Sequence, residues 1–205
     1  HEIWQDRNLG VKLIGLTQYQ EKIPTLLHML IDRTPASLIK RLFGGDYNQV
    51  GFIRRNIVHA LQVMNCLNAE IEKHLLIAAD DPYFETRSQV CRTVSYFGPF
   101  LAGKEEWFQS LRKRIKDKSF EVAIEAAKAM GEIGADGRAL EALMELREDL
   151  HWQLRDAALN GIRRLIERGV ISPSAEIRSQ LATFLLTATD FRPYFSIKET
   201  FKTIE

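Results

Sequence analysis

Residues 121–134 read EVAIEAAKAMGEIG, and residues 153–164 read QLRDAALNGIRR. In the first stretch, small or apolar side chains stand three, four and seven residues after Ala123, a spacing that places them on one face of an α-helix. The same spacing follows four arginines elsewhere in the chain, namely Arg7, Arg54, Arg87 and Arg155. The five starting positions are separated by 47, 33, 36 and 32 residues. Self-similarity at such a period predicts a stacked array of helical repeats.

Each repeat is predicted to contain two antiparallel helices, an outer one that carries the recurring pattern and an inner one that follows it. The five expected pairs cover residues 4–18 and 22–32, 49–65 and 68–79, 82–97 and 103–116, 120–133 and 138–147, and 152–168 and 173–187. Ser119 and the Ser172-Pro173 pair are expected to start two of these helices as caps. No segment alternates between apolar and polar residues over the length of a strand, so no β-sheet is expected.

Two segments depart from the repeat period. Residues 33–48 contain a proline and two glycines around an apolar run, which predicts an irregular insertion with one short helix and a glycine turn. Residues 190–205 are expected to begin a further helix whose partner is missing. We interpret residues 1–205 as a single repeat domain and as a fragment of a longer protein, because the chain starts at His1 and helical pattern begins almost at once.

The composition is that of an ordinary soluble protein, with 45% hydrophobic and 27% charged residues. Every apolar run is far shorter than the ~20 residues of a membrane span, so none is expected in this segment. The net charge of +1 weakens a nucleic-acid assignment, because dedicated binders carry a larger basic excess. Cys91 stands at a core position of the repeat pattern, which predicts a buried free thiol, and neither Cys66 nor Cys91 has a CxxC or Cys/His partner, which favours a cytoplasmic location.

The two quoted stretches resemble HEAT repeats, in particular the short bacterial HEAT-like repeats also found in phycobilisome-lyase-type proteins. The outer helix of that family carries a V-R-x-x-A-A-x-x-L-G pattern, and an R-A-L-x-x-L inner helix follows a glycine-containing turn. The matching residues are Val122, Ala126, Ala127, Met130, Gly131, Ile133 and Gly134, then Arg138, Ala139, Leu140 and Leu143. The resemblance implies an all-α fold, a right-handed α-α superhelix of about five antiparallel helix pairs, and a curved scaffold that binds another macromolecule.

The same resemblance implies a structural ladder between repeats. The outer-helix arginine of the family stacks with loop aspartates, and Ala123 would interrupt such a ladder in the fourth repeat. The expected ladder residues are Arg54, Arg87 and Arg155 with Asp80 and Asp149.

The candidate partner-binding residues lie on the inner helices, which line the concave face in HEAT-like proteins. The basic run 112–118 is the strongest charge cluster, and it is also explained as a solvated helix end whose cations favour the helix dipole. Trp107, if exposed on the inner helix, would be a binding anchor, and the alternative is that it packs between repeats. The candidates are Lys73, Trp107, Gln109, Arg112, Arg114, Lys116, Glu141, Glu145 and Arg178.

The sequence offers no catalytic arrangement. None of the five histidines lies in a metal-ligand spacing, and neither a Walker-type nor a GxGxxG phosphate loop is present, so no catalytic residue, metal or cofactor is expected. We therefore expect a non-catalytic scaffold or adaptor that binds a protein of unknown identity. Two alternatives remain open: a HEAT-type nucleic-acid-binding protein, including one similar to DNA glycosylases, and a protein-modifying enzyme similar to bilin lyases.

Overall fold

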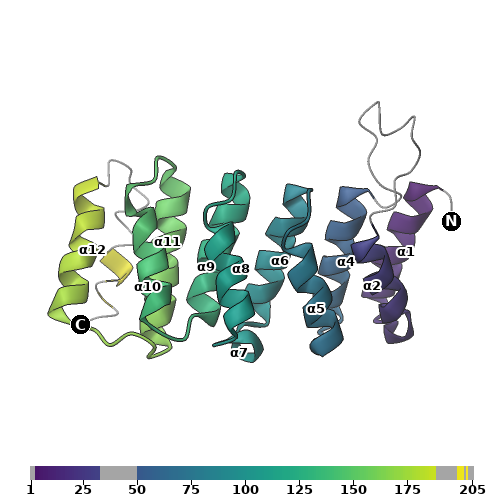
Figure 1. Ribbon diagram of the computed structural model, residues 1–205, viewed down its shortest axis with the longest axis horizontal. Helices are drawn as coiled ribbons and strands as arrows, with labels where there is room; N and C mark the ends of the chain where they lie inside the picture. The colour runs from purple at the N-terminus through teal and green to yellow at the C-terminus, as the bar shows by residue number, and fades with distance from the viewer. Residues whose placement is uncertain (1–2, 33–49, 188–197, 201, 203–205) are drawn as a thin grey trace. The chain divides into compact units, whose positions relative to one another are not determined.

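The structure is a computed structural model that describes residues 3–32, 50–187, 198–200 and 202 (Figure 1). These residues form helices joined by turns and loops, and no strand occurs among them. The insertion expected at 33–48 and most of the helix expected at 190–205 lie outside the described residues. The chain divides into two compact units, residues 1–96 and 97–205, which are described separately below. The single-domain organisation expected from the sequence stays a prediction.

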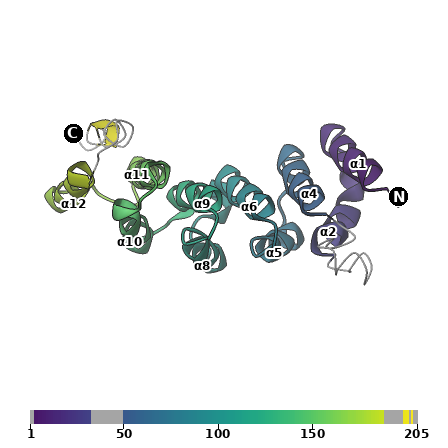
Figure 2. The same cartoon turned by 90° about the horizontal axis from the view of Figure 1, so that it is seen from above.

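The N-terminal unit contains two layers of helices (Figures 1 and 2). Helices α1 (Trp4–Leu16), α4 (Gly51–Val63) and α6 (Phe84–Tyr96) stand side by side in the outer layer. Helices α2 (Ile23–Ile31) and α5 (Ala69–Ala78) form the inner layer, and the short 3-10 helix η1 (Gln20–Lys22) precedes α2. The Asn68 side chain starts α5 by accepting the Ile71 N–H at 2.9 Å, as expected of an N-cap.

The core of this unit comes from the recurring pattern. Ile57, Val58 and Leu61 follow Arg54 at three, four and seven residues, and all three are fully buried. Because α4 packs against both α1 and α6, its apolar face must serve two neighbours at once. The pattern seen in the sequence is therefore the packing surface of the outer layer.

The C-terminal unit repeats the arrangement. Helices α9 (Phe120–Ile133) and α11 (Trp152–Glu167) form its outer layer, and α8 (Glu105–Arg114) and α10 (Gly137–Met144) its inner layer (Figure 2). Short α7 (Gly98–Leu101) precedes α8, the 3-10 helix η2 (Glu145–Glu148) extends α10, and α12 (Ala175–Thr187) follows α11.

Small residues bring α9 and α11 into close contact. A Cβ atom added to Gly131 would lie 2.6 Å from the Cα atom of Gly161, so neither glycine has room for a side chain. Ala127 and Ala158, at the family positions, are fully buried. The interpretation of these small residues as the seam between repeats is confirmed, because side chains of ordinary size would hold the backbones apart.

The helix ends differ in three places from the sequence expectation. The link 98–103 contains the single turn α7 in addition to a glycine turn. Ser119 does not cap α9 with its hydroxyl; instead its own N–H donates to the Asp117 carboxylate at 3.0 Å. Helix α12 begins two residues beyond Pro173, and the hydroxyl of Ser174 accepts the N–H of Ile177 at 3.2 Å. At Ser119 and Ser174 the local hydrogen bonds therefore differ from those expected of the caps, although α9 still begins at the expected residue.

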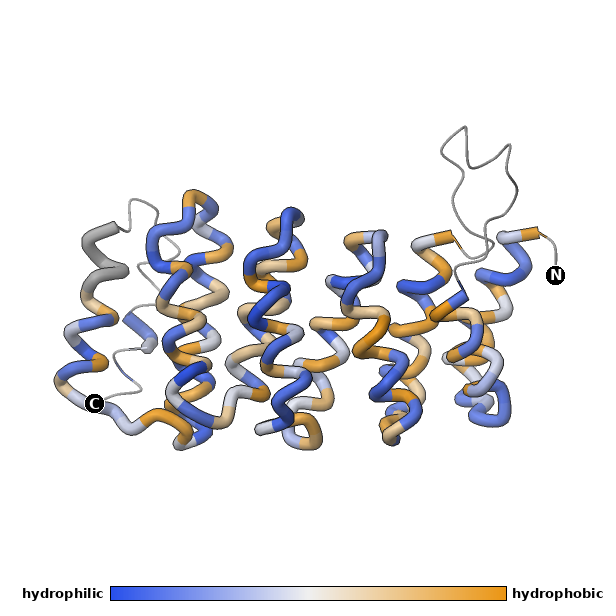
Figure 3. The backbone as a smooth tube through the Cα atoms, viewed as in Figure 1, coloured by the Kyte–Doolittle hydropathy of each residue, from blue (hydrophilic) through white to orange (hydrophobic). Residues whose placement is uncertain are grey.

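The helices carry hydrophobic and hydrophilic residues on different sides, as Figure 3 shows along both units. In the part of the chain that the structure describes, no helix combines the length and apolarity needed to cross a bilayer.

Candidate partner-binding surface

A buried ion pair links two repeats in the N-terminal unit. Arg54 on α4 donates from Nε to Asp81 Oδ2 at 2.7 Å and from Nη2 to Asp81 Oδ1 at 2.8 Å. The side chains are 2% and 0% exposed. Asp81 lies in the turn before α6, so the outer-helix arginine of one repeat binds the loop aspartate of the next. The expected ladder is present here, but its carboxylate is Asp81; Asp80, the predicted partner, is exposed.

The other two ladder arginines bind backbone atoms. Arg87 donates to the carbonyl oxygen of Asp81 at 2.7 Å, and Arg155 donates to the carbonyl oxygen of Asp149. In both cases the acceptor lies six residues earlier in the same repeat. The expected pairing of Arg155 with Asp149 therefore exists through the main chain, not through the carboxylate.

A loop aspartate recurs before each of three outer helices. Asp81, Asp117 and Asp149 each accept the N–H of the residue two positions later, at 2.8, 3.0 and 2.8 Å. This side-chain turn holds the loop in the geometry that lets the next helix begin. The recurrence of these aspartates three residues before α6, α9 and α11 is a signal that the sequence contained and that the ladder prediction missed.

Ion pairs on the inner surface of the C-terminal unit join the end of α8 and the turn after it to Glu145, the first residue of η2. Arg112 donates to Glu145 Oε1, and Lys116 Nζ lies 2.9 Å from Glu145 Oε2. The hydrogen bonds from Lys116 and then from Arg112 lower the pKa of the Glu145 carboxyl. Two of the expected binding cations are thus brought together with one of the expected binding anions, which offsets one of their two charges.

The opposite end of the same surface contains a second network. Arg138 donates to Glu105 Oε2 at 3.1 Å and to Asp136 Oδ2 at 2.9 Å, and its guanidinium lies 4.6 Å from the centre of the Phe108 ring. Hydrogen bonds from Gln109 and Arg138 lower the pKa of Glu105, and the hydrogen bonds to Asp136 and Glu105 raise the pKa of Arg138. Gln109, an expected binding residue, is exposed and donates to Glu105 at 2.7 Å.

Two expected surface residues are buried. Trp107 is 0% exposed, because Trp107, Leu111 and Ile115 form the buried stripe of α8 and its continuation, while Phe108 is half-buried. Trp107 is therefore a core residue and cannot anchor a partner. Arg114 is 9% exposed and donates to Asp117 at 2.9 Å, so this part of the basic run faces the protein itself.

The remaining candidates are exposed. Lys73 lies on α5 in the N-terminal unit, and Glu141 and Arg178 lie on α10 and α12 in the C-terminal unit. Glu141 lines an open pocket of about 390 Å³ together with Met144, Glu145, Arg147 and Glu148.

A second pocket of the C-terminal unit adjoins the first and has a volume of about 440 Å³. We call it the Ala123 pocket. Its lining residues are Ile115, Lys116, Asp117, Lys118, Phe120, Ala123, Glu145, Leu146, Asp149, His151 and Leu154. The rings of Phe120 and His151 stack with 5.5 Å between their centroids and 4° between their planes. Glu145 lines both pockets, which therefore lie next to each other beside α10 and η2. Sequence reasoning had selected only Lys116, Glu145 and the ladder residue Asp149 from the lining of the Ala123 pocket.

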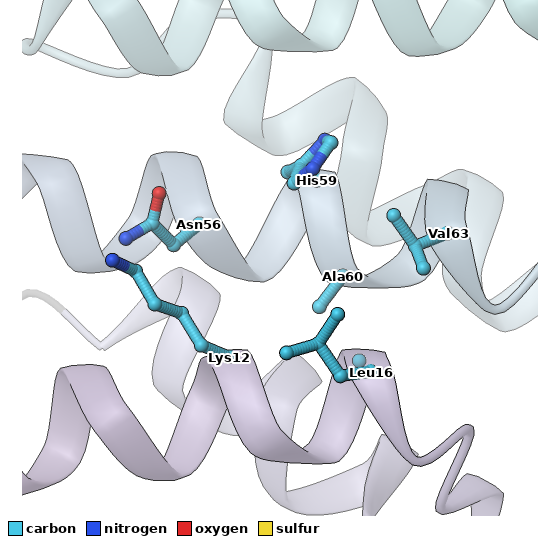
Figure 4. Close-up of a pocket in the computed structure, with 7 residues that line it drawn as sticks. Lys12, Leu16, Asn56, His59, Ala60 and Val63 are labelled. Carbon is cyan, nitrogen blue, oxygen red and sulfur yellow. The ribbon is translucent and has the colours of Figure 1, made fainter.

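The N-terminal unit has a smaller pocket of about 240 Å³ between α1 and α4 (Figure 4). Gly15 and Ala60 form part of its lining, and Leu16 and Val63 flank them at one end. Lys12 and His59 are exposed at its rim. This pocket was not anticipated from the sequence, because it results from two small residues on helices 45 positions apart in the chain.

Metal binding has no support in the described part of the chain. Within those residues no group of three or more histidine, cysteine, aspartate or glutamate side chains is arranged to hold an ion. Both cysteines are free thiols, Cys91 buried and Cys66 half-buried.

Comparison with solved structures shows the fold class of the chain. The chain is similar to the crystal structure of an engineered protein, with a TM-score of 0.52 and 18% sequence identity over 97% of this chain and 96% of the other. It is also similar to a designed armadillo repeat protein in complex with the peptide (KR)4, with a TM-score of 0.52 and 15% identity over 98% of this chain and 99% of the other. No curated protein sequence matches the chain. The expected all-α fold class, an α-α superhelix of repeated helix pairs, is confirmed.

The family follows from the sequence itself. Residues 71–163 match the family described as HEAT repeats. The resemblance drawn from residues 121–134 and 153–164 is thereby confirmed, and these residues are HEAT repeats. Repeat folds of this kind present extended surfaces that typically serve as scaffolds for binding proteins.

Proposed function

We propose that the chain is a non-catalytic scaffold that binds another protein, through the inner-layer surface of its C-terminal unit. The observation that carries this proposal is the pair of adjoining pockets, of about 440 and 390 Å³, that meet at Glu145. The larger pocket combines apolar lining residues with charged ones, and the smaller pocket is lined by charged side chains around Met144; hollows of this size suit the anchoring of side chains from a partner.

The charge pattern favours a protein over a nucleic acid as partner. A duplex binder needs a continuous positive surface to displace counterions from phosphates. Here Glu145 engages Arg112 and Lys116, and Asp117 engages Arg114, so three of the five cations of the basic run 112–118 are held by the protein's own carboxylates. A glycosylase-like activity would also need accessible aromatic rings, and Trp107 is buried.

A partner segment with basic side chains is supported by the exposed carboxylates of the smaller pocket. Glu141, Glu145 and Glu148 lie along α10 and η2, and all three are exposed. The designed armadillo repeat protein of similar fold was solved with a peptide of alternating lysine and arginine. Electrostatic attraction to these glutamates would orient such a segment, and the apolar lining residues of the neighbouring pocket would contribute most of the affinity.

The proposal includes a reducing, cytoplasmic location. The two cysteines are free, and one of them is a buried core residue rather than half of a disulfide.

Fluorescence anisotropy with a labelled (KR)4 peptide tests the proposed function directly. We expect saturable binding at 150 mM salt and at least ten-fold weaker binding by the double variant Glu141→Lys, Glu148→Lys. Glu121→Lys is the matched control, because Glu121 is an exposed glutamate of α9 in the outer layer of the same unit. A labelled 20-base-pair DNA duplex serves as the competing ligand. Tighter binding of the duplex, lost in Lys118→Glu, would overturn the proposal, as would equal peptide binding by all variants.

A further inference from the structure

The Ala123 pocket lies where other repeats carry an arginine. Arg54, Arg87 and Arg155 are each the fourth residue of an outer helix, in α4, α6 and α11. Ala123 is the fourth residue of α9 and lines the pocket. Replacement of an arginine by alanine removes most of a long side chain, so a hollow at this position is the expected consequence unless a neighbour fills it.

The N-terminal unit shows what occupies the equivalent position when the arginine is present. Arg54 extends to the loop aspartate 27 residues later and holds both of its carboxylate oxygens, at 2.7 and 2.8 Å. Neither side chain is more than 2% exposed. The position therefore accommodates a guanidinium with two parallel hydrogen bonds, the arrangement that arginine forms best with a carboxylate.

The acceptor of this arrangement is retained beside Ala123. Asp149 stands three residues before α11, as Asp81 stands three residues before α6. Both aspartates accept the N–H two residues later at 2.8 Å through Oδ1. The Asp149 side chain is 32% exposed, whereas that of Asp81 is 0% exposed. Among the described residues, the backbone N–H and the ring Nδ1 of His151 both contact Asp149 Oδ1, at 2.8 and 3.0 Å, and Asp149 lines the pocket.

The rest of the lining suits a guanidinium group. Leu146 and Leu154 are buried apolar residues of the lining against which a methylene chain can pack, and Phe120, whose ring stacks on that of His151, is 43% exposed. Of the two lysines in the lining, Lys116 is paired with Glu145 at 2.9 Å, which offsets part of its charge. Lys118 is exposed and opposes an incoming cation only through solvent-screened repulsion.

We propose that the Ala123 pocket receives an arginine side chain from a partner protein, which then completes the ladder that this chain leaves open. The guanidinium would bind Asp149 as Arg54 binds Asp81. The inference rests on the proposed function only in assigning the arginine to a protein partner. The chemistry of the pocket can be tested without any partner.

The experiment is an amide-resolved NMR titration of the whole chain with the tripeptide Ac-Gly-Arg-Gly-NH2. We expect saturable shifts of the Asp149 and His151 backbone amides in the millimolar range. The citrulline tripeptide has nearly the same shape without the charge, and we expect it to bind at least ten-fold more weakly. Asp149→Asn, which keeps the turn-forming oxygen but loses the charge, should also weaken binding at least ten-fold. Ala123→Arg should abolish the response by filling the pocket from within.

Three outcomes would overturn the inference: equal affinity for the citrulline tripeptide, preference for Ac-Gly-Glu-Gly-NH2, or unchanged arginine binding in Asp149→Asn. If Ala123→Arg fails to fold, Asp149→Asn still decides the question. Failure here is distinguishable from failure of the proposed function, because that function is measured with the (KR)4 peptide and the Glu141→Lys, Glu148→Lys variant. Binding of (KR)4 without a tripeptide response would leave the scaffold intact and remove only the pocket assignment.

Discussion

The pair formed by Arg54 and Asp81 provides the sharpest test of how neighbouring repeats are joined. Arg54→Ala would leave a carboxylate that is 0% exposed without the guanidinium that binds both of its oxygens. Removal of one partner from a buried ion pair costs about 3–5 kcal/mol, because the remaining charge stays desolvated. We expect a loss of this size in the free energy of unfolding of the N-terminal unit.

The adjacent residue supplies a matched control. Arg55 pairs with Glu85, but these side chains are 38% and 33% exposed. Pairs exposed to solvent contribute about 0–1 kcal/mol, so Arg55→Ala should cost no more than about 1 kcal/mol. Both variants remove an arginine from α4, and they differ mainly in the burial of the pair.

Native-state hydrogen exchange is the suitable assay, since repeat arrays often unfold in parts and a single melting curve mixes them. Arg54→Ala should lower the protection of α4 and α6 amides far more than Arg55→Ala does. A double-mutant cycle with Arg54→Met and Asp81→Asn should give a coupling free energy of about 1–3 kcal/mol. A loss below about 1 kcal/mol for Arg54→Ala, or a coupling near zero, would refute the reasoning that the buried pair joins the repeats.

Three further predictions concern the C-terminal unit. Trp107→Ala should destabilise the protein by about 3–5 kcal/mol in chemical denaturation, since Trp107 is 0% exposed. A loss under about 1 kcal/mol would indicate that Trp107 is a surface residue instead. Gly131→Ala should cost more than about 2 kcal/mol, because its Cβ would lie 2.6 Å from the Gly161 backbone, which cannot rotate away as a side chain can; an unchanged melting temperature would contradict the proposed seam. Glu145→Gln should cost about 0.2–1 kcal/mol at pH 7. Folding lowers the pKa of the Glu145 carboxyl, so its ion pairs stabilise the protein above the unfolded-state pKa of glutamate, and this stabilisation is lost as pH falls through the folded-state pKa. The melting temperatures of wild type and Glu145→Gln should therefore converge in acid. A difference that grows in acid would exclude stabilisation by these ion pairs.

The repeats were predictable where local pattern and tertiary packing agree. The outer helix expected at 120–133 is found with those bounds, because its small residues lie at the helical period and pack against the same period in α11. Such agreement depends only on spacing within one helix and its copy one repeat later. It does not require knowledge of any distant contact.

The side of α8 that faces the core was not predictable in the same way. Trp107 and Phe108 are adjacent, and both lie at core spacing from Leu111 and Ile115, so the pattern does not separate them. The structure buries Trp107 and leaves Phe108 half-buried beneath Arg138, a residue of the next repeat. The cation that covers the second ring is 30 positions away, and local spacing contains no information about it.

The ladder carboxylate is that of Asp81 instead of the predicted Asp80, for a related reason. Asp80 and Asp81 are neighbours, and an aspartate followed by proline, as in Asp81-Pro82, is typical of a helix start. In the structure one carboxylate performs both tasks, accepting the Tyr83 N–H and the Arg54 guanidinium. The local role of Asp81 at the start of a helix gives no hint in the sequence of its long-range pairing with Arg54, although one carboxylate has enough acceptor sites for both.

Ala123, which departs from the repeat pattern, indicates more about function than the residues that obey the pattern. A residue that obeys the repeat is explained by packing, as the buried Ala127 and Ala158 are. Ala123 breaks the repeat and gives up a guanidinium, yet the aspartate that would bind it remains at Asp149 with its side chain 32% exposed. The Asp149 carboxylate keeps its turn-forming hydrogen bond to the N–H of His151, and its charge stays accessible to a donor from outside the chain. Asp149→Leu should lower the stability of the isolated protein, because it removes this turn, whereas Asp149→Asn should keep the turn and lose only arginine binding.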